Sequence, residues 1–137
     1  MDAKIREYCR HIRKVRIEVL RRDYQTGVWY WDLPAAAVIC YDKKRTKQKR
    51  GYAHSPKGTH WHNVLYCQLS KLGELGKSPR SGGNIIGNCA EQHAGNNFMN
   101  HYKCKNIKYL YFSEAVRPRT MEVIPPCNNC KSIFPNL

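Results

Sequence analysis

The sequence is poor in acidic residues, with 10 Asp and Glu against 24 Lys and Arg, which gives a net charge of +14 over 137 residues. An imbalance of this size favours polyanionic partners such as nucleic acids. The sequence also lacks an apolar run near the roughly 20 residues that a membrane-spanning helix needs. Its first segment is charged throughout and has no apolar centre of a secretory signal. We therefore expect neither a membrane protein nor a secretion signal of its own.

The seven cysteines do not form the even set that a disulfide scaffold needs, and two of them make a tight Cys-x-x-Cys pair. This usage favours reduced thiols and metal binding, and hence a cytoplasmic protein. The contents of 42% hydrophobic and 11% aromatic residues are those of a folded chain. We expect one domain over residues 1–137, because the chain is too short for two independent cores.

Apolar spacing predicts the main elements. A helix is expected over residues 4–22, and its outer face makes 1–24 a basic N-terminal helix. A buried strand is expected over 35–41, a second helix over 60–72 and an apolar strand over 107–112. The Gly-rich residues between the second helix and Cys89 are expected to form a loop.

A basic run follows the first predicted strand, with six cations in eight residues: Lys43, Lys44, Arg45, Lys47, Lys49 and Arg50. Residues 51–54 then read as a returning strand, so the run is predicted to be the tip of a hairpin. Its cations fit a loop that contacts phosphates. A solvated turn and a nuclear-import-like signal are the alternatives, because short basic segments are weakly specific.

Two cysteine motifs carry the chemistry of the chain: Cys89-Ala90-Glu91, and Pro126 followed by Cys127 and Cys130. Each motif is predicted to start a helix beside one returning strand, which would bring three thiols to a common point. Three thiolates suit zinc and leave a fourth tetrahedral position for water. Glu91, two residues after the first ligand, would reach that water.

The two motifs together resemble the His/Cys-x-Glu and Pro-Cys-x-x-Cys signature of the zinc-dependent nucleobase deaminases. Asn88, the segment 112–115 and the segment 117–119 make the surroundings similar to deaminase domains of bacterial polymorphic toxins. The resemblance covers a core of residues 35–134. It implies an α/β, cytidine-deaminase-like layered fold with helices packed on a small sheet.

The usual deaminase fold adds two strands and a helix after the second zinc helix, whereas this sequence ends at Leu137. Such a sheet would lack the C-terminal strands. Three arrangements remain open: residues 121–124 add an edge strand, the sheet has about three strands, or a partner covers the exposed side.

The resemblance also implies the chemistry and the site. Cys89, Cys127 and Cys130 match the Zn²⁺ ligands, and Glu91 matches the catalytic proton shuttle. The reaction is hydrolytic deamination of cytosine to uracil, and the basic charge points to single-stranded nucleic acid, DNA slightly before RNA. If the chain is toxin-like, an immunity protein is a partner and a carrier outside this chain delivers it into the target-cell cytoplasm. Residues expected near the substrate are Asn84, Asn88, His54 and Arg117.

Other interpretations of the same residues stay open at this stage. A free cytidine or an adenine or RNA deaminase fits the zinc motif equally, although Gln92 stands where small cytidine deaminases commonly carry an Arg that offsets thiolate charge. Arg117, Arg119 or Lys131 would then have to supply the charge. His93, four residues after Cys89, would instead close a structural zinc site in a nucleic-acid-binding module without catalysis.

Overall fold

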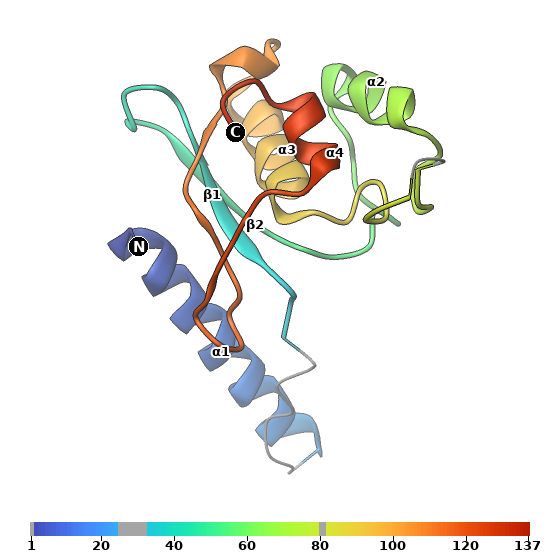
Figure 1. Ribbon diagram of the computed structural model, residues 1–137. Helices are drawn as coiled ribbons and strands as arrows, with labels where there is room; N and C mark the ends of the chain where they lie inside the picture. The colour runs from blue at the N-terminus through green and yellow to red at the C-terminus, as the bar shows by residue number, and fades with distance from the viewer. Residues whose placement is uncertain (1, 25–32, 80–81) are drawn as a thin grey trace.

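The computed structural model describes residues 2–24, 33–79 and 82–137, and within them the protein is a mixed α/β molecule (Figure 1). The α-helices of the described residues are α1 (Ala3–Tyr24), α2 (Asn63–Leu72), α3 (Ala90–Tyr102) and α4 (Asn128–Ile133). The strands are β1 (Ala37–Tyr41), β2 (Gln48–Tyr52), β3 (Tyr111–Phe112), β4 (Ala115–Val116) and β5 (Val123–Ile124). The expectation of an α/β fold with helices packed on a small sheet is confirmed. None of the helices in the described segments has both the length and the apolar character needed to cross a membrane.

The sheet is antiparallel and is built around β1, in the order β2-β1-β4-β5, with β3 also paired to β1. Every residue of β1 is buried because both faces of the strand are covered. On one face of β1, Ala37, Ile39 and Tyr41 pack on Ile5 and Tyr8 of α1. On the other face, Val38 and Cys40 belong to the core formed with α2, α3 and α4. Figure 1 shows α1 on one side of the strands and the other helices on the opposite side.

The strand predicted over 107–112 is largely wrong. Ile107–Tyr109 is a short 3-10 helix, η2, because the Asn106 side chain accepts a hydrogen bond from the Lys108 amide at 3.1 Å and caps it. The strand beside β1 begins at Tyr111 and is interrupted at Ser113, whose hydroxyl accepts from the Ile39 amide at 3.0 Å. β4 then resumes the pairing with β1 at Ala37 opposite Val116, and the sequence did not predict it.

Residues 121–124 contribute the added edge strand, the first of the three arrangements considered: Val123–Ile124 pairs with β4. The basic hairpin is also present, but its second strand starts earlier than predicted. β2 begins at Gln48, so Lys49 and Arg50 lie in the strand rather than in the tip. The Asp42 carboxylate fixes the tip by accepting from the Thr46 hydroxyl at 2.6 Å and the Lys47 amide at 2.9 Å.

Helix α3 and strand β2 run antiparallel and in close contact. The Tyr102 hydroxyl donates to the Gln48 carbonyl at the end of α3, and Asn97 donates to the Arg50 carbonyl in its middle. Nearer the start of α3, Gly51 lies so close to Ala94 that an added Cβ would overlap the Ala94 backbone. The 13 residues of α3 span about 20 Å at 1.5 Å per residue. The start of α3 and the basic hairpin are therefore at opposite ends of this pair.

Candidate metal centre

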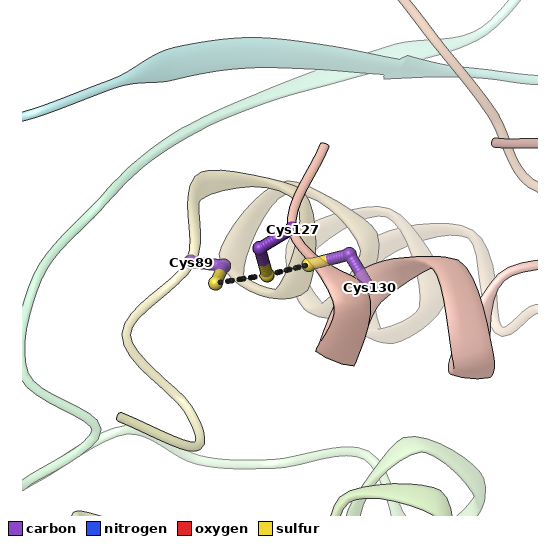
Figure 2. Close-up of side chains that lie close together, drawn as sticks. All are labelled: Cys89, Cys127 and Cys130. Carbon is purple, nitrogen blue, oxygen red and sulfur yellow. Dashed lines mark hydrogen bonds between the residues drawn. The ribbon is translucent and has the colours of Figure 1, made fainter. Parts of the chain in front are cut away.

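Three cysteine sulfurs meet between the starts of α3 and α4 (Figure 2). Their Sγ atoms all lie within 4.8 Å of one another. Cys127 is in the middle, 3.2 Å from the Cys89 sulfur and 3.7 Å from the Cys130 sulfur. Tetrahedral zinc with Zn–S bonds of about 2.3 Å requires sulfur–sulfur distances of about 3.8 Å. The three thiols thus fit a single metal ion with small adjustments, and the sequence-based expectation that they converge is confirmed.

Two helix starts position these sulfurs. Cys89 is the N-cap of α3 and Cys127 the N-cap of α4, and neither side chain makes a capping hydrogen bond. Cys130 follows in α4 and is fully buried. Because no cysteine side chain caps the first-turn N–H groups, the partial positive charge of the α3 start remains directed toward the sulfur cluster. The local sequence therefore provides a site that favours anionic sulfur.

The thiols share their protons unequally. Hydrogen bonds from Cys130 and Cys89 lower the pKa of the central Cys127 thiol far below its usual value. The hydrogen bonds of Cys130 to Cys127 and to Cys89 raise the pKa of Cys130, and the bond to Cys127 raises that of Cys89 to about 12. The Asn84 side chain also hydrogen-bonds Cys127 and contributes to its lowered pKa. Cys127 is therefore the thiol of the three that loses its proton most readily, and a bound cation would favour loss of the other two protons as well.

Gln92 makes a hydrogen bond to the sulfur cluster from inside the protein. Its side chain is fully buried, its Nε2 donates to the Cys130 sulfur at 3.5 Å, and its Oε1 accepts from the Gly87 amide at 2.8 Å. It therefore connects a thiol of α4 to the loop that carries Cys89. In the sequence, Gln92 was noted only as a departure from the deaminase pattern. In the structure it contacts a sulfur of the cluster. Among the described residues, no such contact is made by the three cations considered as substitutes, Arg117, Arg119 and Lys131.

Glu91 lies in the first turn of α3 with only 6% of its surface exposed. Its Oε2 is 3.4 Å from the Cys130 sulfur. Burial raises the pKa of this carboxyl above its ordinary value, because the charged form loses its hydration. A buried carboxyl of raised pKa beside a thiol cluster is the kind of group that serves in proton transfer.

A cavity of about 540 Å³ opens on this group, and Glu91, Cys89 and Cys127 line it. Its volume falls in the range of sites that hold small organic ligands. Three of the four residues expected near a substrate also line it: Asn84, Asn88 and Arg117. The Asn88 Oδ1 and the Arg117 Nε are buried inside the protein without a hydrogen-bond partner. His54, the fourth, is not part of the lining and lies outside on the exposed surface.

His93 does not complete the metal centre. Its Nε2 bonds to the backbone carbonyl of His54 at 2.9 Å, and a carbonyl only accepts, so this nitrogen carries the proton. Burial lowers the pKa of His93 to about 4, which keeps the ring neutral. The His93 ring stacks on the His54 ring at 3.6 Å between centroids. The metal group of the described residues comprises the three thiols without His93.

Some cations of the basic run contact other side chains, and others are exposed in the tip of the hairpin. Arg45 pairs with Asp2 at 2.8 Å, Arg50 lies over the Tyr8 ring and Lys47 over the Tyr102 ring. Lys43 and Lys44 are exposed in the tip. None of the six lines the metal-centre cavity, which lies at the far end of α3.

Comparison with protein families, with curated proteins and with solved structures found no match for this chain.

Proposed function

We propose that this protein is a zinc-dependent hydrolase that deaminates cytosine in single-stranded nucleic acid, in the manner of the toxin-type deaminases that its two motifs resemble. The observation that carries the proposal is a cavity lined by two thiols of a three-thiol cluster and by a buried carboxyl, Glu91. A closed structural site would need a fourth protein ligand, and His93 is turned to a backbone carbonyl instead.

Zinc fits the donor set, because three thiolates in tetrahedral spacing suit this ion. When bound, zinc lowers the pKa of a water molecule toward about 7 and so supplies a nucleophile at neutral pH. The chain's own residues do the rest. Glu91 accepts a proton from the attacking water and delivers protons to ring N3 and to the leaving amine. The C4–O bond forms first, with N3 protonated, and the C4–N bond then breaks as the protonated amine leaves, so cytosine and water become uracil and ammonia.

The rest of the cavity supports recognition of a base. Asn88 and Arg117 both line the cavity beside Glu91, so their side chains lie where a bound base or sugar would contact them. Asn84 is already engaged, because its side chain bonds Cys127 and its carbonyl accepts from Asn129 at 2.9 Å. We therefore assign Asn88 and Arg117 to substrate binding, and Asn84 to a hydrogen bond that orients the metal ligand Cys127.

The test compares the zinc-bound protein with Glu91→Gln on single-stranded DNA, single-stranded RNA, duplexes and free nucleosides, with products read by sequencing and chromatography. We expect uracil from one single-stranded substrate, and a loss of at least about 10³ in rate for Glu91→Gln, because one carboxyl handles every proton transfer. Zinc content should persist in the variant. A variant that deaminates like wild type would refute the mechanism. A wild type that deaminates none of these substrates would favour the binding module without catalysis.

A further inference from the structure

A second pocket adjoins the metal-centre cavity, on the other side of a shared wall. It has a volume of about 420 Å³ and shares three lining residues, Gly83, Asn84 and Cys127, with the cavity. Two hydrogen bonds hold the wall: the Asn84 side chain bonds Cys127, and the Asn84 carbonyl accepts from the Asn129 Nδ2 at 2.9 Å. A group bound in this second pocket, which we name the side pocket, therefore lies next to a group bound in the cavity.

The charge of the side pocket disfavours a phosphate. The remainder of its lining comes from Gly82, Pro126, Asn128 and Asn129, so no cation contributes to it. Its one ionisable side chain is Cys127, and the three thiolates of the metal centre outweigh the charge of one Zn²⁺. The Gly82 N–H already donates to the Pro79 carbonyl at 2.9 Å and is not available to an anion. These groups suit an uncharged ligand.

Two amide side chains supply the hydrogen-bonding groups of the side pocket. Asn129 is 8% exposed, and its Nδ2 is already bonded to Asn84, whereas its Oδ1 has no partner among the described residues. Asn128 is exposed at the first position of α4, and its side chain bonds none of the residues that the structure describes. A free amide presents a donor and an acceptor side by side, the pattern that pairs with the edge of a nucleobase.

The glycine side of the pocket is bare backbone. Gly82 and Gly83 have φ angles of 85° and 103°, in the left-handed region that side chains rarely adopt. A Cβ added to either residue would meet no atom within 4 Å, so the space above both is open. A flat ring can therefore approach the chain closely there.

We propose that the side pocket binds the base of the nucleotide next to the one held in the metal-centre cavity, and that the Asn128 amide selects this base by its hydrogen-bonding edge. The inference rests on the proposed function, because it assumes that the base in the cavity belongs to a strand. It gives the protein a sequence preference at one neighbouring position, and it locates that preference in the residues at the start of α4.

The experiment measures binding of fluorescent oligonucleotides to zinc-bound protein in the Glu91→Gln background, which prevents turnover. Each oligonucleotide, prepared as DNA and as RNA, has about 6 nucleotides, within the range of single-strand sites, and one cytosine. The base before the cytosine and the base after it are varied in turn. The test variant is Asn128→Ala. The matched control is Asn63→Ala, because Asn63 is also exposed and also begins its helix, α2, but lines neither pocket.

At one of the two neighbouring positions we expect the Glu91→Gln parent to discriminate between bases by about 5-fold to 150-fold, the range for one bidentate pair between an amide and a base. Asn128→Ala should reduce this discrimination to within about twofold and keep its zinc content. Asn63→Ala should keep the discrimination of the parent. Asn128→Asp should discriminate again but favour cytosine, whose N4 amine donates to a carboxylate. A structural role of Asn128 would not move the preference to another base.

A parent without base preference at either neighbour would overturn the assignment, and so would a preference that Asn128→Ala keeps or that Asn63→Ala also loses. Deamination of randomised single strands, with Glu91 intact, separates this result from the proposed function. If the wild type deaminates nothing but base preference in binding depends on Asn128, the deaminase proposal fails and the side pocket stands. If the wild type and Asn128→Ala deaminate cytosines with the same neighbours, the side pocket alone fails.

Discussion

Replacing Gln92 with Leu is expected to weaken zinc binding without touching a zinc ligand. Leu fills a similar volume, but it removes the donor to the Cys130 sulfur at 3.5 Å and the acceptor for the Gly87 amide at 2.8 Å. Partners of metal ligands typically change metal affinity by about 10-fold to 100-fold. This corresponds to about 1.4–2.7 kcal/mol. The metal-free protein should also lose about 1–3 kcal/mol of stability, because the Gly87 N–H is left buried without a partner.

The assay separates these two effects. A competition titration with a zinc chelator gives the affinity, and urea unfolding of the metal-free protein gives the stability. His93→Leu is the matched control, because His93 is the next residue and is 3% exposed, and its ring bonds the His54 carbonyl and the backbone of Gly87 rather than a sulfur. It should lose stability and keep its zinc affinity. If Gln92→Leu binds zinc as tightly as wild type, the contact with Cys130 does not tune the metal centre. If His93→Leu loses zinc, the closed four-ligand site regains support.

Three other predictions follow from the same geometry. Cys127→Ala should lose both the metal, expected at about one zinc per chain by elemental analysis, and the stability that binding adds, whereas Cys67→Ala, at an exposed thiol, should keep both. The pKa of His93 is lowered from 6.5 to about 4 in the folded protein, so between these pH values His93 binds a proton in the unfolded chain but not in the folded one. The free energy of unfolding in urea should therefore fall as the pH drops from 6.5 to 4. His93→Leu should lack this part of the pH dependence. Lys43→Gln with Lys44→Gln should leave the melting temperature unchanged and reduce the salt slope of single-strand binding by up to about 1.4, and an unchanged slope would show that the exposed tip is solvated rather than bound to phosphate.

The sequence predicted elements where a long apolar pattern exists. Helix α1 and the buried strand β1 follow from such patterns, and the starts of α3 and α4 follow from the cysteine motifs. Residues 107–116 carry too weak a pattern: Asn106 caps a 3-10 turn, and the Ser113 hydroxyl replaces a backbone acceptor of the sheet. Strand pairs of two residues, such as β4 with β5, are stabilised by tertiary contacts that local sequence does not encode.

The candidate site shows the same division. The convergence of three thiols could be predicted from their spacing and from the helix starts they occupy. The role of His93 could not, because the four-residue spacing from Cys89 places two side chains together only when both residues are helical. Cys89 is an N-cap in extended conformation, with φ −66° and ψ 144°, so its side chain leaves the helix face that His93 follows. The contact between Gln92 and Cys130 joins two helices, and no motif within one segment predicts it.

Two arginines of the basic run have a structural role in this fold. Arg45 and Arg50 hold the β1–β2 hairpin against α1, the former through Asp2 and the latter over the Tyr8 ring. Exposed contacts of this kind contribute about 1 kcal/mol or less each, so they orient the hairpin more than they stabilise it. A guanidinium that already lies over a ring or beside a carboxylate releases fewer counterions when a phosphate approaches. Lys43 and Lys44, which are exposed in the tip, rather than Arg45 and Arg50, are therefore the cations of the basic run whose replacement should most change the salt dependence of any binding to a polyanion.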